Sequence, residues 1–388
     1  MQPLQQPTQN RNHSIDAIRG FALFGILMVN YLSFHSPHFM YGGMDEFHTS
    51  SGDQTILTII DWFFQASFYP LFSLLFGIGI YMMYIRLQAK APEQSKKILI
   101  RRMIVLGFIG LIHGVFIWYG DILLTYSVIG LISILFLNMK VKTLVKTAVS
   151  MLVIVATLFS LMYYGIKDYL ESYRDQQSIQ ASFENYQGGF SQIFSQNLND
   201  WLVMVGPFQW LVIIPTILPM FLFGIALMKS GWLTNTEAHL SSMKKALYAS
   251  GLIFLVFKIG PYAIGMPAWL DLLQDTLGGS ASSLFYFLGA MIIFETGKLN
   301  WLKHKLSPVG KMSLTNYLSQ SVVGYVLFYG VGVALYGQLT LIVLVMVVVT
   351  VFLLQVMVSS WYAKRFYYGP AEWIYRSLTY GKVQKWKR

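Results

Sequence analysis

Cysteine is absent from this chain of 388 residues, and charged side chains make up only 12% of it. Without thiols the protein can form no disulfide, no zinc–thiolate site and no thioester intermediate of its own. Soluble domains carry about 25% charged residues, so the low charge argues against an ordinary soluble domain. Apolar residues take the place of charge: 55% of the chain is hydrophobic and its mean hydropathy is +0.53. The composition predicts an integral membrane protein.

Apolar runs of about 20 residues predict membrane helices, because a bilayer core about 30 Å thick needs that length at 1.5 Å per residue. We expect an all-α bundle of about ten such helices, forming a single transmembrane domain over residues 15–363. The polar segment 1–14 has no apolar run, so no cleaved signal peptide is expected. The predicted spans are residues 15–34, 56–83, 98–118, 122–137, 144–166, 201–228, 246–264, 282–294, 314–336 and 339–361.

The net charge of +11 belongs to short loops and not to a basic domain, which argues against nucleic-acid binding. Twenty-five of the 28 Lys and Arg residues fall in the termini and loops of one side, the exceptions being Lys167, Arg174 and Lys258. Cytoplasmic loops carry the excess of Lys and Arg. We therefore expect both termini in the cytoplasm, with a basic, aromatic tail over residues 364–388. The longest loop, residues 167–200, is then extracytoplasmic and long enough for one or two amphipathic helices.

Ionisable residues within the apolar hairpin 98–138 form the first candidate site, since such a residue in a membrane helix is a functional hypothesis by default. His113 lies eleven residues beyond Arg102, about 16 Å along a helix. Asn30 lies eleven residues beyond Arg19, so Asn30 and His113 are expected at one level. Three further side chains should lie near that level: Asp61, Asp121 and Tyr126. A His beside a carboxylate suits a general base, or a structural hydrogen bond.

Arginines define a second, inner pole of the same bundle. Arg19, Arg101 and Arg102 lie near the predicted cytoplasmic surface, where guanidinium groups can bind phosphates. Arg19 follows Asp16 by three residues, so the two share a helix face and can pair. Alternatively, Arg101 and Arg102 are topology signals alone. The segment that opens as GKMSLTNYLSQS carries a polar stripe with Asn316, Tyr317 and Gln320. That stripe either packs helices together or lines a ligand path. Lys258, near the outer end of its span, is expected to extend outward to the membrane surface.

Several stretches resemble the YeiB-like family of bacterial multi-pass membrane proteins. They are SIDAIRGFALFGILMVNY, LFSLLFGIG, IHGVFIWYGDILLTYSVIG, FLFGIALMKSGWL, GKMSLTNYLSQS and YYGPAEWIYRSLTY, in that order along nearly the whole chain. The resemblance implies a bacterial cell membrane location. The sequence departs from the family pattern at Ser67, where a Lys is usual.

This family is distantly similar to the transmembrane acyltransferases, in which an acyl-CoA binds on the cytoplasmic side and its acyl group passes to an acceptor on the far side. The sugar O-acyltransferases of that group carry an Arg, ten residues and a His. Here Arg19 is followed instead by Asn30. The heparan glucosamine enzyme has an Asn-Tyr pair there, similar to Asn30-Tyr31, with its His further on, a place that His35 or His38 could take.

The resemblance implies an acyltransferase, with acyl-CoA as the donor, a small-molecule, glycan or lipid acceptor, and no metal. His113 would be the general base, oriented by Asp121, while Asn30 and Tyr31 hold the acyl carbonyl. The CoA phosphates would bind Arg19, Arg101 and Arg102, and the substrate-lining residues would be Asp61, Tyr126, Asn316, Tyr317 and Gln320. The same polar interior also fits a transporter or lipid flippase, although the sequence offers no matching broken helices. A third possibility is a non-catalytic membrane partner.

Overall fold

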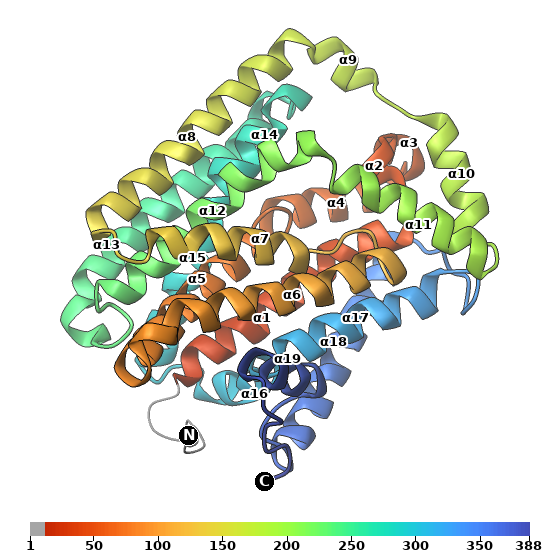
Figure 1. The fold of residues 1–388 in the computed structure, drawn as a ribbon. Helices are drawn as coiled ribbons and strands as arrows, with labels where there is room; N and C mark the ends of the chain where they lie inside the picture. Colours follow the sequence, from red (N-terminus) through yellow and green to blue (C-terminus); the bar gives the residue numbers. More distant parts are fainter. Residues whose placement is uncertain (1–11) are drawn as a thin grey trace.

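The computed structural model describes residues 12–388, so most of the expected N-terminal segment 1–14 lies outside the described residues. Within residues 12–388 there is no named strand, only two isolated bridges, and the prediction of an all-α polytopic bundle is confirmed. Over the described residues, eight helical segments are long and apolar enough to cross a membrane. The start of α1 and the C-terminal segment lie at the same end of the bundle (Figure 1).

Each predicted span coincides at least in part with a helix, and the main helices of the bundle are as follows. Those of the N-terminal half are α1 (His13–His35), α4 (Ser51–Phe63), α5 (Phe68–Lys90), α6 (Ser95–Phe116), α7 (Leu123–Ser133) and α8 (Val141–Gly165). Those of the C-terminal half are α12 (Pro207–Lys229), α13 (Thr236–Phe254), α15 (Gly279–Glu295), α16 (Asn300–Lys311), α17 (Ser313–Phe328), α18 (Leu341–Ala363) and α19 (Pro370–Tyr380). The remaining helices are α2 (His38–Tyr41), α3 (Met44–Phe47), α9 (Lys167–Ser172), α10 (Gln176–Tyr186), α11 (Phe190–Met204) and α14 (Asp271–Leu273).

Two predicted spans are short helices, and two begin in the wrong place. The span predicted from residue 246 begins earlier, at Thr236, the start of α13. The span predicted at 122–137 is α7 with a 3₁₀ turn, and that at 314–336 is the 16-residue α17 followed by an irregular segment. The span predicted from residue 201 starts at Pro207 instead. Trp201 belongs to α11, and a turn at Gly206 separates the two helices, with Pro207 at the first position of α12.

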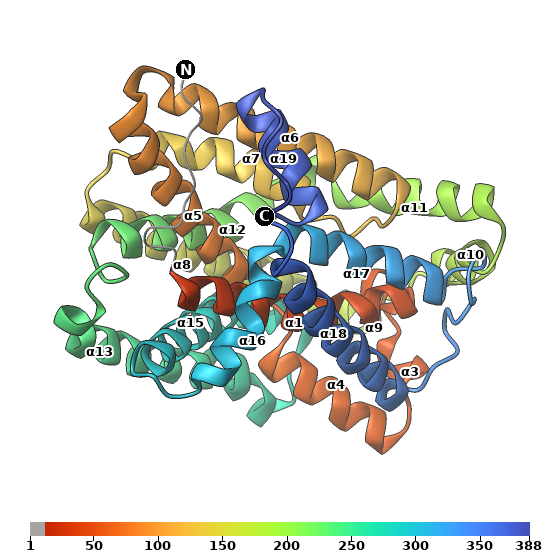
Figure 2. The ribbon, with the colours of Figure 1, turned by 90° about the horizontal axis from the view of Figure 1, so that it is seen from below.

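Helix α1 runs through the middle of the bundle, where it packs against α5, α15, α16, α17 and α18 (Figures 1 and 2). Its closest neighbour is α16, and glycines on both helices permit the contact. A Cβ atom on Gly310 would collide with the carbonyl oxygen of Asp16, and one on Gly20 with the carbonyl oxygen of Leu306. Small residues allow such close backbone approach between helices in membranes.

Three helical segments are interrupted within the membrane region. The chain breaks between α4 and α5, where Ala66 takes a positive φ of 52°. Helix α13 continues into a π-helical turn at Leu255–Ile259, and a second π turn, Gln274–Gly278, precedes α15. Isolated π turns are rare and are frequent at functional sites. Of these interruptions, only the π turn at Leu255–Ile259 falls inside a span that the sequence predicted as one regular helix, 246–264, and there the prediction was wrong.

The predicted extracytoplasmic loop contains α9, α10 and most of α11. Asp200 of α11 is buried, and its carboxylate accepts hydrogen bonds from the hydroxyl groups of Tyr41 (2.5 Å) and Tyr186 (2.6 Å) and from the side-chain amide of Gln196 (2.8 Å). Burial raises the pKa of Asp200 above its usual range. These bonds connect α2, α10 and α11 into one outer layer.

At the opposite end the tail contributes α19, which packs against α6 and α17. The Glu372 carboxylate accepts hydrogen bonds from the backbone N–H groups of Leu314 (2.6 Å) and Thr315 (3.1 Å) and from the Thr315 hydroxyl (2.5 Å). These are donors that the first turn of α17 would otherwise leave unpaired. The tail is therefore joined to the bundle at the start of the polar helix α17.

Candidate functional site

His113 and Asp121 form a buried pair at the turn between α6 and α7. The ring Nδ1 of His113 lies 2.8 Å from Oδ1 of Asp121, and the side-chain exposures are 1% and 0%. The other carboxylate oxygen accepts a hydrogen bond from the backbone N–H of Leu124 at 2.8 Å, so Asp121 also caps α7. One oxygen of the Asp121 carboxylate is therefore held by the start of α7, while the other contacts His113.

The second ring nitrogen of His113 is the atom on which chemistry can take place. Its Nε2 is buried and has no hydrogen-bond partner among residues 12–388. With Nδ1 protonated and bonded to Asp121, Nε2 carries a lone pair, the arrangement of a general base with an orienting carboxylate. The ring of Tyr317 lies 5.3 Å from that of His113, and the Tyr317 hydroxyl accepts from the backbone N–H of Ile122 at 3.4 Å.

Asn30 and Tyr31 are not joined to this pair. Asn30 is partly exposed, and its side chain makes no hydrogen bond within residues 12–388. Tyr31 is fully buried against α17, where its hydroxyl donates to the backbone carbonyl of Gln320 at 3.1 Å. The structure therefore brings together His113, Asp121 and Tyr317 from the predicted site residues.

The other expected lining residues make contacts between helices. The Tyr126 hydroxyl donates to the carbonyl of Tyr69 at 2.7 Å. The side-chain amide of Asn316 donates to the Ser359 hydroxyl at 3.1 Å, and that of Gln320 to Gln355 at 2.8 Å. Asn316 and Gln320 of the polar stripe thus face α18, whereas Tyr317 faces His113 and Ile122. His35 and His38 lie in the outer layer, where the His35 Nε2 accepts from the backbone N–H of Leu339 at 3.1 Å.

The inner arginines fall into two groups. Arg19 pairs with Asp16 at 3.4 Å, as their spacing predicts, and donates to the carbonyl of Leu75 in α5 at 3.4 Å. Arg102 instead stacks over the ring of Tyr375 in the tail, 4.3 Å from its centroid. Arg101 is exposed and lies beside Gly381. Arg101 and Arg102 therefore contact the tail, whereas Arg19 contacts the core of the bundle.

The end of the bundle where α1 begins and the C-terminal segment lies is called the basic end, because the loops rich in Lys and Arg gather there (Figure 1). A cavity of about 970 Å³ opens at this end. It lies where α1 and α13 begin and α5, α12 and α15 end. Five ionisable residues line it: His13, Arg86, Glu237, Glu295 and Lys303. Ligand cavities of small molecules and cofactors are about 300–1,000 Å³, so this one has the size for a nucleotide-like ligand.

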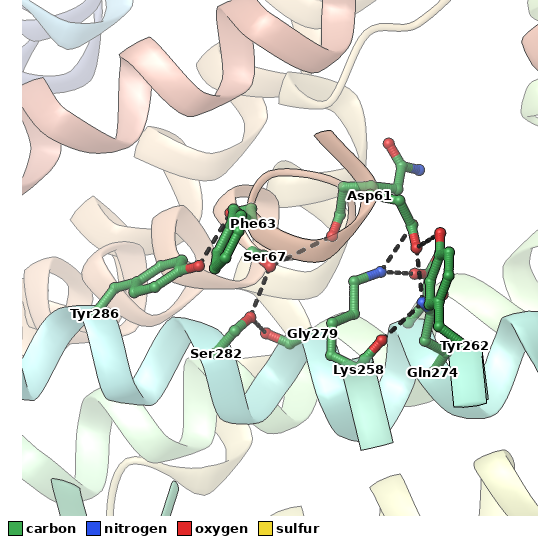
Figure 3. A network of polar contacts seen from close by, with 11 residues as sticks. Asp61, Phe63, Ser67, Lys258, Tyr262, Gln274, Gly279, Ser282 and Tyr286 are labelled. Atoms are coloured by element: carbon green, nitrogen blue, oxygen red, sulfur yellow. Dashed lines mark hydrogen bonds and ion pairs between the residues drawn. The ribbon is translucent and has the colours of Figure 1, made fainter. Parts of the chain in front are cut away.

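A second buried polar cluster surrounds Lys258, which the sequence analysis expected at the membrane surface. Lys258 has an exposure of 0%, and its ammonium lies 2.7 Å from Asp275 and 3.1 Å from Asp61. The other oxygen of Asp61 accepts from the Tyr262 hydroxyl and from the Gln274 amide, both at 2.7 Å. Figure 3 shows the lysine side chain directed toward these groups. The outward extension predicted for Lys258 was wrong, because two carboxylates provide its counter-charges inside the bundle.

The helix interruptions explain how this cluster forms. A π turn leaves backbone groups out of the regular helix ladder, and the carbonyl of Lys258 accepts instead from the Gln274 side chain at 3.0 Å. The two π turns meet at Gly278, where a Cβ atom would lie 2.7 Å from the backbone nitrogen of Lys258. A Cβ atom on Gly279 would collide with the carbonyl of Ala66, at the break between α4 and α5. Two consecutive glycines thus hold three interrupted segments together.

Ser67, the position of the departure from the family pattern, lies beside this junction. It is fully buried, and its hydroxyl oxygen accepts from the Ser282 hydroxyl at 2.6 Å (Figure 3). The sequence signal for the junction was the pair Gly278-Gly279 at the edge of an apolar segment, together with a lysine inside a span. Of these signals, only the lysine entered the prediction, as a side chain extending outward.

Fold and sites define a polytopic α-helical membrane protein with ionisable groups enclosed between its helices. The chain belongs to the YeiB-like family. YxaH of Bacillus subtilis (strain 168) is 31% identical over 96% of this chain and 95% of its own, and YeiB of Escherichia coli (strain K12) is 30% identical over 95% and 96%. Both are described as uncharacterised. Residues 227–382 match the family model described as a protein of unknown function (DUF418).

Proposed function

We propose that the protein is an acyltransferase of the bacterial cell membrane, moving an acyl group from cytoplasmic acyl-CoA to a hydroxyl or amine on the opposite side. The observation that carries the proposal is the buried His113–Asp121 pair, whose free Nε2 has no partner in residues 12–388. Buried polar atoms are nearly always hydrogen-bonded, so an unpaired imidazole nitrogen next to an orienting carboxylate is suited to a bound acceptor.

In this scheme Nε2 of His113 takes the proton from the acceptor O–H or N–H while the acceptor atom bonds to the acyl carbonyl carbon. The carbon–sulfur bond of the thioester then breaks, and the CoA thiolate takes the proton from His113. Asp121 stabilises the imidazolium between these two transfers, at 2.8 Å from Nδ1. Tyr317, whose ring lies beside the imidazole, would line the acceptor position.

The cavity of about 970 Å³ supports a donor site on the side of the bundle where α1 begins. Arg86 and Lys303 line it and suit the CoA phosphates, while Glu237 and Glu295 line it too, so the phosphates would lie on the Arg86 and Lys303 side. Ile15 of α1 also lines it, and Arg19 lies one helical turn further into the bundle. Arg19 is therefore better placed than Arg101 or Arg102 to act with this cavity, since the latter two contact the tail.

The test uses the absence of cysteine, because free CoA thiol can then be titrated without background from the protein. Purified protein in nanodiscs receives acetyl-CoA with glucosamine as the acceptor probe. His113→Gln should lower thiol release by about 10²–10⁴-fold while acetyl-CoA binding, measured by calorimetry, is unchanged. His239→Gln, at the basic end, is the matched control. Equal turnover by both variants would exclude His113 as the base.

Arg86→Ala provides an independent measurement on the donor side. We expect it to weaken acetyl-CoA binding, with Lys142→Ala, an exposed position on α8, as the control of equal charge change. Saturable binding that falls with added salt supports the phosphate contact. A wild type that is folded and binds no acetyl-CoA contradicts the proposal.

The Lys258 cluster favours a second candidate function, transport of a small solute. Transporters place their substrate and coupling-ion sites where interrupted helices meet near the middle of the membrane, and three interrupted segments meet at Lys258 here. Uptake of an unmodified solute by proteoliposomes, abolished by Asp275→Asn and retained by His113→Gln, would support transport. The reverse pattern, with thiol release lost in His113→Gln alone, supports acyl transfer.

A further inference from the structure

A small pocket of about 380 Å³ lies at the basic end, separate from the cavity lined by Arg86. It is formed by α16, the last turn of α18 and the final residue of the chain. Its ionisable lining residues are all bases: His304, Lys305, Lys364 and Arg388. No Asp or Glu lines the pocket.

The backbone fixes these four side chains in one place. His304 and Lys305 lie on the turn of α16 that includes Pro308, and Lys364 follows the last residue of α18. Arg388 is brought there by short antiparallel pairing, in which its backbone N–H donates to the carbonyl of Arg365 at 3.0 Å. The backbone itself therefore brings the four basic residues together, independently of their side-chain conformations.

No Asp or Glu side chain pairs with these bases in the part of the chain that the structure describes. Lys305 and Lys364 form no ion pair within residues 12–388, and the guanidinium of Arg388 lies 5.6 Å from the ring centre of Tyr367. Positive charges placed together repel one another, so a bound anion would offset an unfavourable arrangement. The pocket is thus suited to an anion with several oxygens, such as a phosphate group.

The level of the pocket indicates the source of that phosphate. Ser360 and Ala363, which line it, lie in the last turn of the membrane-spanning helix α18. Two exposed tryptophans lie nearby in the sequence, Trp361 on α18 and Trp301 on α16. Tryptophans are enriched at the membrane–water interface, at the depth of the lipid headgroups. Basic pockets between helices on the cytoplasmic side suit anionic headgroups.

We propose that the pocket formed by His304, Lys305, Lys364 and Arg388 binds the phosphate of an anionic phospholipid in the cytoplasmic leaflet. The lipid joins α16, which packs against α1, to the end of α18 and the C-terminal segment. This site is independent of the proposed acyl transfer, since neither His113 nor the larger cavity contributes to it.

The experiment compares phosphatidylglycerol with phosphatidylcholine on the full-length protein. Delipidated protein in detergent is titrated with each lipid, and bound lipid is counted by native mass spectrometry while thermal stability is followed. A Lys near an anionic surface contributes about five-fold in affinity, so Lys305→Ala with Lys364→Ala should weaken phosphatidylglycerol binding roughly 25-fold. Both side chains are exposed, so the variant should fold normally.

The control is Lys142→Ala with Lys146→Ala, which removes the same charge from exposed positions on α8. Retained phosphatidylglycerol binding in this control, and in Lys305→Arg with Lys364→Arg, supports the pocket. Equal losses in the control and the test variant would reduce the effect to net charge and overturn the proposal. Stabilisation by inorganic phosphate equal to that by phosphatidylglycerol would overturn it in favour of a soluble phosphate ligand.

Discussion

Lys258 allows a sharp test of the structure, because its enclosed ammonium depends on two carboxylates for counter-charge. Asp61→Asn alone leaves the Asp275 carboxylate 2.7 Å from the Lys258 ammonium, and Asp275→Asn alone leaves the Asp61 carboxylate 3.1 Å from it. The carboxylates are themselves 22% and 29% exposed, so each single change should cost only about 1–2 kcal/mol. The double variant leaves the cation enclosed without any counter-charge, which costs about 3–5 kcal/mol.

Adding Lys258→Met to the double variant removes the stranded charge and keeps an apolar side chain of similar length. We expect this triple variant to recover most of the loss, although it has one more substitution. With an unfolding entropy of about 2.1 cal/mol/K per residue, the whole loss in the double variant corresponds to roughly 4–6 °C in Tm for a chain of 388 residues, and most of this difference should be recovered.

The assay is thermal unfolding of detergent-purified protein, followed by the fluorescence of its ten tryptophans. The expected order of Tm is wild type, then the triple variant, then the double variant. Lys229→Met is the control for the third substitution. The Lys229 ammonium donates to two backbone carbonyls, at 3.1 and 2.8 Å, and lies over the ring of Tyr81 at 5.7 Å, without a carboxylate partner among residues 12–388. A triple variant no more stable than the double one, or equal rescue by Lys229→Met, would falsify the ion-pair account.

Three further predictions concern other parts of the chain. Glu372→Ala should lower the free energy of unfolding by about 1–2 kcal/mol, because it removes the cap of α17. Limited trypsin digestion should then release the tail faster than in the wild type, and Glu372→Gln should give an intermediate rate. Burial raises the pKa of Asp200, so the folded protein binds the proton of this carboxyl more tightly than the unfolded chain does. The resulting gain in the free energy of unfolding is complete below the unfolded pKa of about 3.9. It is lost as the pH rises through the raised pKa. Asp200→Asn should therefore flatten the fall of Tm as pH rises from about 4, and an unchanged profile would contradict this. Gly310→Ala should cost about 1–3 kcal/mol against the Asp16 carbonyl, measured as Tm, whereas Gly289→Ala, with its nearest neighbour at 3.7 Å, should be nearly neutral.

The sequence predicted the helices because length and hydropathy decide whether a segment crosses a bilayer. It also predicted the contacts formed within one helix or one hairpin. Asp16 and Arg19 are three residues apart, and His113 and Asp121 are separated only by a tight turn, so chain connectivity alone brings each pair together. No knowledge of the other helices was needed for either pair.

The Lys258 cluster was beyond sequence reasoning for a different reason. Lys258 and Asp61 are 197 residues apart, and their contact depends on two π turns and a helix break. A π turn has no simple sequence signature, because it forms where tertiary contacts satisfy the displaced backbone groups. Here those contacts are the Gln274 side chain and the close approach at Gly278.

The separation of Asn30 from His113 shows what arithmetic along a helix leaves open. Eleven residues at 100° each return to within roughly 20° of the starting face. Asn30 therefore shares a face of α1 with Arg19, which points to α5, and Tyr31 lies about 100° away, facing α17. By the same rule His113 shares a face of α6 with Arg102, toward the tail and α17. Residue counts along each helix predict an equal depth for Asn30 and His113. However, the face of α1 that carries Asn30 and the face of α6 that carries His113 contact different helices. A site built on both residues would require α1 to rotate, and the close contact of Gly20 and Gly310 with backbone atoms opposes that rotation.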